Sequence, residues 1–284
     1  KLYAGVTHKV HGVHKQVWNP DLVDIIMIRE NTEGLYHSLL RRMEQRALGK
    51  KDEPIVIEEF PGLDGEVAWD PRPISRDGSE RVIRFAFDYA KHRQRKTGAS
   101  QSVTCVDKSN VTRGCQLFRK IFREFAERNP DIAVKEAYID AFTMWLVRNP
   151  EDLDVVVLPN MFGDIATDLA SVLQGGMGMS ASANMGPKHM LFEPVHGSSP
   201  KHAGKNVVNP IAMIQSVQMM FEALAFRKKD QNLDTCAEIL QNAIQKHFEE
   251  GGIVTYDLGG TASTSEVGQA IAMRCESMLK ERFP

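Results

Sequence analysis

Two aspartates four residues apart, Asp164 and Asp168, are the first candidates for chemistry in this sequence. They follow a β-branched run at 154–158 that is typical of a buried strand, and the apolar spacing after that run predicts a helix. Both carboxylates would share one face of this helix, and no Lys or Arg stands three or four positions away to neutralise them. All-oxygen ligands of this kind suit Mg²⁺ or Mn²⁺. The alternative is a solvated helix face with two scattered acids, and spacing alone favours that alternative.

Further polar residues follow other predicted strands. Arg29 and Tyr36 come after an apolar run at 24–28, where an Arg could grip a carboxylate and a Tyr could transfer a proton. Lys108 and Asn110 come after the run at 103–106, and a Lys beside a divalent cation can act as a base. Taken singly, each residue could equally be a surface charge or part of a structural ion pair.

Two more features belong to this group. Asp140 follows the predicted strand at 132–138, and the loop at 196–204 carries glycines and small hydroxyls. Backbone amides of such a loop could approach a phosphate, although the same composition also suits a plain turn.

The elements that must position these residues alternate along the chain. Strand patterns at 103–106, 132–138 and 154–158 are separated by helical patterns at 112–128 and 141–147, which predicts an α/β domain with much parallel pairing. Later helices are predicted after Asn209-Pro210, at about 233–248, and after a capping box formed by Ser263 and Glu266.

The N-terminal part is less regular. Residues 2–6 could form a strand, and His8, His11 and His14 are expected in a solvated loop. The segment 38–78 reads as an excursion with short strands that could form an arm contacting another subunit.

Composition narrows the class of protein. The 284 residues have a formal net charge of −2, which gives no reason to expect nucleic acid or an anionic membrane as a partner. Four widely spaced cysteines lack a C-x-x-C pattern, and no apolar run has the length of a membrane span. We therefore expect a cytoplasmic protein that acts on a small molecule.

Five motifs follow one another over nearly the whole chain. They are Arg-Glu-Asn-Thr-Glu-Gly at 29–34, Asp-Lys-Ser-Asn at 107–110, Tyr-Ile-Asp-Ala-Phe at 138–142, Asn-Met-Phe-Gly-Asp-Ile-Ala-Thr-Asp at 160–168 and Glu-Pro-Val-His-Gly-Ser-Ser-Pro at 193–200. Together they closely resemble the β-decarboxylating dehydrogenases, the family of isocitrate, isopropylmalate, homoisocitrate and tartrate/D-malate dehydrogenases. The resemblance implies the two-domain, non-Rossmann α/β fold of isopropylmalate dehydrogenase.

The resemblance also implies a metal and substrate site in a homodimer with shared active sites. Asp164 and Asp168, with Asp140 from the second subunit, would hold Mg²⁺ or Mn²⁺. Arg29 would bind a substrate carboxylate, and Asn110 would lie near the nicotinamide end of the substrate site.

Two residues would carry the proton transfers. By resemblance, Lys108, which would also reach across the dimer, would help to remove the hydroxyl proton as hydride leaves for the nicotinamide. Tyr36 would protonate the carbon that loses CO₂.

The cofactor would be NADP or NAD. The charges of Lys201 and His202 favour the 2′-phosphate of NADP, and Tyr256 fits the same preference, although a family Arg used for NADP corresponds to Gly260 here. The positions that match the family's cofactor-binding residues are Glu193, His196, Gly197, Ser198, Ser199, Pro200, Lys201, His202, Asn209, Tyr256 and Asp257.

The resemblance predicts two domains of unequal completeness. Residues 1–174 would form the small domain, with the dimerisation arm and the metal and substrate residues. Residues 175–284 would form the C-terminal half of the large, cofactor-binding domain, so part of the large-domain sheet would be missing together with the family's usual N-terminal segment.

The expected function is therefore metal-dependent oxidative decarboxylation of a 2-hydroxy acid that carries a β-carboxylate. The motif at 29–34 places isocitrate first, with tartrate/D-malate or isopropylmalate next. The alternative is a non-catalytic regulatory subunit, or a truncated and inactive member of the same family.

Overall fold

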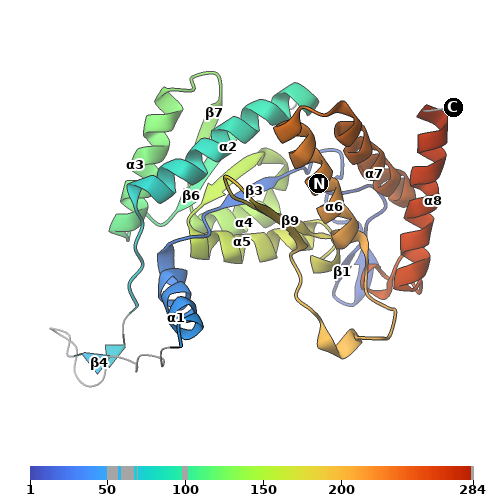
Figure 1. Ribbon diagram of the computed structural model, residues 1–284, viewed down its shortest axis with the longest axis horizontal. Coiled ribbons are helices and arrows are strands. Elements are labelled where there is room, and N and C mark those ends of the chain that lie inside the picture. The colour runs from blue at the N-terminus through green and yellow to red at the C-terminus, as the bar shows by residue number, and fades with distance from the viewer. Residues whose placement is uncertain (50–56, 59–66, 69, 98–101, 283–284) are drawn as a thin grey trace. The chain divides into compact units, whose positions relative to one another are not determined.

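The structure, a computed structural model, describes residues 1–49, 57–58, 67–68, 70–97 and 102–282 (Figure 1). It divides into two compact units, one formed by residues 25–167 and the other by residues 1–24 together with 168–284. Within the described ranges, no helix combines the length and the apolar composition needed to cross a membrane.

A parallel sheet forms the centre of the 25–167 unit. Its strand order is β3-β8-β6-β7, with β3 at Ile26–Arg29, β6 at Ser102–Asp107, β7 at Ala133–Tyr138 and β8 at Val155–Leu158. All three pairings are parallel, as the alternation of strands and helices predicts. The candidate residues that follow β3, β6 and β8 therefore leave the same edge of the sheet.

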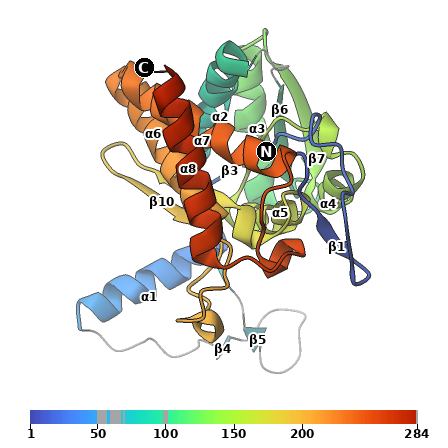
Figure 2. The ribbon, with the colours of Figure 1, turned by 90° about the vertical axis from the view of Figure 1, so that its right-hand side faces the viewer.

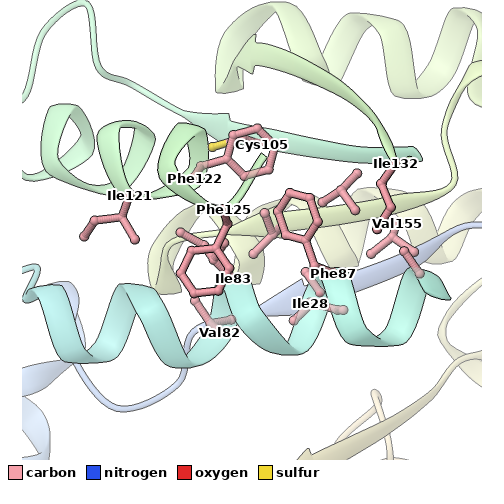
Figure 3. Close-up of a cluster of buried hydrophobic side chains, with 14 of the residues drawn as sticks. Ile28, Val82, Ile83, Phe87, Cys105, Ile121, Phe122, Phe125, Ile132 and Val155 are labelled. Atoms are coloured by element: carbon pink, nitrogen blue, oxygen red, sulfur yellow. The ribbon is translucent and has the colours of Figure 1, made fainter. Parts of the chain in front are cut away.

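Helices cover both faces of this sheet. The helices α2 (Arg76–Thr97) and α3 (Arg113–Glu127) supply aromatic side chains such as Phe87 and Phe122 to a core that also contains Val155 and Val157 of β8 (Figure 3). Val156 lies between these valines and points to the opposite face of the sheet, since successive side chains of a strand alternate. Val156 is also buried, so both faces of β8 are covered. The helix α4 (Ile139–Arg148) packs on β6 and β7 and buries its own apolar residues, while α5 (Asn160–Leu173) begins directly after β8.

Residues 50–56, 59–66 and 69 of the predicted arm at 38–78 lie outside the described residues. The short helix η1 (Gly34–Tyr36) leads into the arm. The described elements of the arm include the helix α1 (His37–Ala47) and the antiparallel pair of β4 (Ile57–Glu58) and β5 (Val67–Ala68). Its role as a dimer contact stays a prediction.

The second unit is built from helices that lie side by side. The helix α7 (Gln231–Glu249) packs against both α6 (Ile211–Lys228) and α8 (Thr264–Arg282), as Figure 2 shows. The antiparallel hairpin of β9 (Ala181–Met185) and β10 (Met190–Pro194) packs on α6. At the start of α8, Ser263 and Glu266 exchange hydrogen bonds, which confirms the predicted capping box.

The limits of the two units differ from the predicted domains 1–174 and 175–284. The N-terminal residues pack with the C-terminal helices: Tyr3 stacks on Phe248 with ring centroids 5.9 Å apart, and Thr7 donates a hydrogen bond to the carbonyl of Leu258. Residues 2–6 do not form the expected strand, and the expected histidine loop is a hairpin of β1 (His8–Val10) and β2 (Val13–Lys15). Burial of Leu2, Tyr3 and Val6 explains why this segment joins the C-terminal unit.

His247 gives the second unit a pH-dependent stability. Its side chain is buried, its Nε2 lies 2.8 Å from the carbonyl oxygen of Ile253, and its Nδ1 has no hydrogen-bond partner among the described residues. Burial lowers the pKa of His247 below its ordinary value, because a charged ring would lose its hydration.

We expect the free energy of unfolding to fall as the pH drops below about 6.5. The unfolded chain takes up a proton on this histidine near pH 6.5, whereas the folded chain does so only at lower pH, so protons favour unfolding. Urea unfolding between about pH 7.5 and 5.5 measures the slope. His247→Gln should flatten it and the exposed control His189→Gln should not; an unchanged slope in His247→Gln contradicts the assignment.

Candidate active site

Residues at the start of α5 bind the side chain of Arg29, the last residue of β3. Asn160 accepts hydrogen bonds from Nε and Nη2 of Arg29, at 3.1 and 2.7 Å, and Asp164 accepts one from Nη1. The sequence showed no local cation to neutralise Asp164; the structure supplies one from a strand 135 positions away. The guanidinium is thereby held in one orientation, which suits it to bind a carboxylate.

Tyr36 completes this cluster. Its hydroxyl donates a hydrogen bond of 2.5 Å to the second carboxylate oxygen of Asp164, and the Arg29 guanidinium lies 5.4 Å from the centre of its ring. The structure therefore brings together Arg29, Tyr36 and Asp164, three of the residues selected from the sequence. A phenol in this position can exchange a proton with a group bound beside Arg29.

Gly163 leaves room for the Arg29 side chain. A Cβ at this position would lie 2.6 Å from Cγ and 2.7 Å from Cβ of Arg29, which is closer than such atoms approach. The Asn-x-x-Gly-Asp spacing at 160–164 thus has a local explanation. Asn160 and Asp164 bind the Arg29 guanidinium, and Gly163, which has no side chain, leaves space for the Cβ and Cγ atoms of Arg29.

The loop after β3 is fixed by a buried carboxylate. Glu30 is 4% exposed and accepts hydrogen bonds from the backbone amides of Thr32 and Glu33 at 2.8 and 2.9 Å. Arg81 of α2 pairs with the same carboxylate at 3.1 Å. Asn160 donates to the carbonyl of Glu33 at 2.8 Å, so both the amide and the carbonyl of Glu33, three residues before Tyr36, are hydrogen-bonded.

A second cluster joins the ends of β6 and β7. Lys108 follows β6, and its Nζ lies 2.8 Å from Oδ1 of Asp140 in the first turn of α4. The hydrogen bond from Lys108 is the main reason why the pKa of Asp140 lies below its usual range. Asn110 is exposed in the turn after Lys108.

The donor chemistry of the aspartates fits a hard divalent cation. Asp164 and Asp168 lie one turn apart on α5, and Asp168 is exposed. In the part of the chain that the structure describes, no three His, Cys, Asp or Glu residues are gathered closely enough to hold a metal. The predicted trio takes Asp140 from the partner subunit and Asp164 and Asp168 from α5 of one chain.

The predicted cofactor-binding residues all belong to the second unit. His202, in the short helix η4 (Pro200–His202), stacks on Tyr256 of η5 (Tyr256–Leu258), with ring centroids 5.9 Å apart and planes 20° apart. Ser199, which has a left-handed backbone, lies 2.9 Å from Nδ1 of His202. Asn209 is buried and donates a hydrogen bond of 3.0 Å to Asp257.

A cavity of about 300 Å³ opens beside the stacked rings. The sequence pointed to two of its lining residues, His202 and Tyr256, but missed Val207, Thr261 and Ala262. Apolar and small side chains next to a ring pair offer a surface on which a planar ring could stack. The remaining predicted residues (Glu193, His196, Gly197, Ser198, Pro200 and Lys201) lie in β10, in η4 or in the loop between them.

Sequence reasoning also missed Asn160 as a binding partner of Arg29. Its place directly after a buried strand was a usable signal, because the first residue of such a helix lies at the carboxyl edge of the sheet. Its specific partner depends on the pairing of β3 with β8, which the local sequence does not encode.

The comparisons with known proteins agree with the motifs. The family model described as isocitrate/isopropylmalate dehydrogenase matches residues 5–271. The chain is 38% identical to the 3-isopropylmalate/3-methylmalate dehydrogenase of Methanocaldococcus jannaschii over 256 residues, and 38% identical to the homoisocitrate dehydrogenase of the same organism over 263 residues. These alignments cover 90% and 92% of this chain but 68% and 66% of the relatives, so the chain spans about two thirds of their length.

A solved structure supports the same grouping. The crystal structure of isocitrate dehydrogenase from Methylococcus capsulatus superposes with a TM-score of 0.75 at 33% sequence identity, covering 96% of this chain and 70% of that one. The α/β architecture with its parallel sheet is thus that of isopropylmalate dehydrogenase-like proteins, as the motifs predict. The chain belongs to the isocitrate/isopropylmalate dehydrogenase family.

Proposed function

We propose that this protein catalyses the oxidative decarboxylation of a 2-hydroxy acid bearing a β-carboxylate, with hydride transfer to NAD(P). The observation that carries the proposal is the mutual contact of the guanidinium of Arg29, the phenol of Tyr36 and the carboxylate of Asp164, which supports their proposed roles as carboxylate-binding group, proton donor and metal ligand. Isocitrate is the first substrate to test, followed by tartrate or D-malate and isopropylmalate. Two relatives are named for isopropylmalate and homoisocitrate, so these acids belong in the same substrate test.

Each residue has a defined task in this reaction. Arg29 holds a substrate carboxylate with its fixed guanidinium, and Asn110 contributes at the nicotinamide end. Lys108 of the partner subunit accepts the proton of the substrate hydroxyl while the carbinol hydride leaves for the nicotinamide. CO₂ then departs with cleavage of a carbon–carbon bond, and Tyr36 delivers a proton to the carbon left behind.

Asp164 and Asp168, with Asp140 of the partner subunit, would hold Mg²⁺ or Mn²⁺. When bound, the cation supplies Lewis-acid stabilisation of the negative charge that develops on substrate oxygens. In the free chain, Arg29 and Tyr36 occupy both carboxylate oxygens of Asp164 and keep that side chain in place.

The cofactor is proposed to bind at the loop 196–204 and the stacked pair His202 and Tyr256. The positive charge of Lys201 and the ring nitrogens of the neighbouring His202 support NADP over NAD.

Lys201→Asp is expected to raise the KM for NADP by about tenfold or more, because it removes one charge-assisted hydrogen bond to a phosphate. The KM for NAD should change much less, since NAD has no 2′-phosphate. Initial rates with each cofactor give both constants, and Lys205→Asp, an exposed charge in the following turn, is the matched control. Equal effects on NADP and NAD would exclude Lys201 from phosphate recognition.

A homodimer is proposed because α4 and α5 expose large apolar side chains. Met144 and Trp145 of α4 and Ile165 of α5 are 52, 42 and 54% exposed. Large apolar side chains that are exposed on a folded chain are candidates for an association surface. Dimerisation through these helices would also bring Asp140 and Asp164 of different copies near one interface.

Trp145→Glu is expected to weaken the dimer by about 30-fold, the effect of losing an aromatic anchor from an interface centre. Light scattering coupled to size-exclusion chromatography over a dilution series measures the dissociation constant. Phe226→Glu, which changes an aromatic residue 69% exposed on α6, is the control. If Trp145→Glu stays dimeric at every concentration, the dimer uses another surface.

The reaction is tested by following NAD(P)H absorbance with Mn²⁺ across isocitrate, isopropylmalate, D-malate and tartrate. Turnover of one of these acids that stops when the metal is chelated supports the proposal. NADP binding without turnover of any of them would instead indicate a non-catalytic subunit.

A further inference from the structure

We propose that Arg119 is a positioning residue that holds Lys108 next to Asp140 by hydrogen-bonding to the ends of both β6 and β7. The inference rests on the proposed function for the roles of Lys108 and Asp140, but the contact itself can be measured without turnover.

Asp107, the residue before Lys108, is fully buried and receives the Arg119 guanidinium. Nε of Arg119 donates to one carboxylate oxygen at 2.8 Å, and Nη2 donates to the other at 2.9 Å. A buried carboxylate needs such a partner, because the loss of its hydration is otherwise uncompensated. The second oxygen of Asp107 also accepts the backbone amide of Ser109 at 2.7 Å, which fixes the turn that carries Lys108.

The same guanidinium reaches the neighbouring strand. Nη2 of Arg119 donates to the carbonyl of Ala137 at 3.0 Å, and the guanidinium lies 4.8 Å from the centre of the Tyr138 ring. In the register of β6 and β7, Asp107 lies opposite Tyr138. The helix α4 begins at Ile139, so Asp140 follows the anchored carbonyl within one turn. One planar side chain therefore fixes the backbone on both sides of the Lys108–Asp140 ion pair.

Arg123 provides a contrast within the same helix. It lies one turn after Arg119 on α3 and pairs with Glu136 through two hydrogen bonds of 2.7 Å. The Arg123 side chain is 63% exposed, whereas that of Arg119 is 11% exposed. Within the described part of the chain, the hydrogen bonds and the ion pair of Arg123 go to the Glu136 carboxylate and not to the backbone that carries Lys108 or Asp140. Glu136 also lies 3.6 Å from Nη1 of Arg119, so Arg123→Met is a control that removes one Arg–carboxylate pair on the same helix while leaving the bonds of Arg119 to Asp107 and to the Ala137 carbonyl in place.

The test measures how fast acetic anhydride modifies Lys108, followed by mass spectrometry and normalised to the exposed Lys120 of α3. An amine held against a carboxylate must leave that ion pair before it reacts. Asp140→Asn, which removes the partner directly, should raise the Lys108 rate about three- to fivefold. Arg119→Met should raise it to a similar extent, and Arg123→Met should leave it unchanged.

Arg119→Lys is a second variant that tests the same contact if Arg119→Met does not fold. Lysine keeps the positive charge beside Asp107 but cannot bind Asp107 and the Ala137 carbonyl with one planar fork, so the Lys108 rate should still rise. If Asp140→Asn accelerates the modification and the Arg119 variants do not, Arg119 does not position the pair. If Asp140→Asn also has no effect, the ion pair is not formed and the inference fails with it.

Neither failure would touch the proposed reaction, which is decided by the absorbance screen. Where that screen finds a substrate, Arg119→Met should lower kcat by about 100-fold with a much smaller change in KM, as expected for a misplaced catalytic group. Arg123→Met should retain both constants.

Discussion

Asp164→Asn is expected to lower metal-dependent turnover by at least about 10³-fold. The substitution removes the charge of a proposed metal ligand, and it also removes the anion that Arg29 and Tyr36 share. Asparagine has nearly the same shape, so α5 should fold as before. The measurement is the initial rate of NAD(P)H formation at saturating Mn²⁺, with thermal unfolding as a check on the fold.

The control for this prediction is Asp131→Asn, which neutralises an exposed aspartate away from the cluster and should leave the rate unchanged. A fully active Asp164→Asn protein would show that Asp164 is no ligand of an essential cation. The Arg29–Asp164 contact would then be a structural ion pair.

Lys108→Met is expected to lower kcat for the hydroxy acid by about 10² to 10⁴-fold, the usual contribution of a general base. Methionine keeps the length and apolar stem of the side chain, so substrate binding should change little. The same variant should retain decarboxylation of the corresponding β-keto acid supplied from outside, because that step needs no hydroxyl proton to be removed.

Tyr36→Phe should show the reverse pattern. It removes the proton donor for the final step while leaving Lys108 in place, so the expected defect is slow conversion of the keto acid into CO₂ and product, with the enolate protonated by water in place of the phenol, while oxidation of the hydroxy acid is less affected. Oxidation and keto-acid decarboxylation can be followed separately by absorbance and by product analysis. If both variants lose both half-reactions equally, the two proton transfers are not divided between these residues.

Local pattern was enough to predict most of the 25–167 unit. The strand at 154–158 and the helix at 112–128 both correspond to observed elements, because buried strands and amphipathic helices carry their period in a short stretch of sequence. The segment 2–6 shows the limit of the method. Its apolar residues are buried, as a strand pattern suggests, but they pack on α7 and the following turns without joining a sheet.

The candidate site was predicted in its residue types but not in its contacts. The sequence identified Asp164 as a carboxylate that needs a cation, yet the cation that contacts it in the folded chain is Arg29, brought there by the parallel pairing of β3 and β8. The Arg119–Asp107 pair likewise depends on how α3 packs on β6. Contacts between distant segments follow from register and packing, which a reading of neighbouring residues does not contain.

The shared metal site is tested most directly by mixing two variants, Asp140→Asn and Asp164→Asn, each of which is expected to be inactive alone. If Asp140 of one copy and Asp164 of the other form one site, a mixed dimer contains one intact site and one doubly altered site. Unfolding and refolding an equal mixture should then restore tight Mn²⁺ binding, measured by electron paramagnetic resonance, and turnover to about a quarter of the wild-type level. Recovery of neither in a mixture shown to contain mixed dimers would contradict a site built from two copies of this chain.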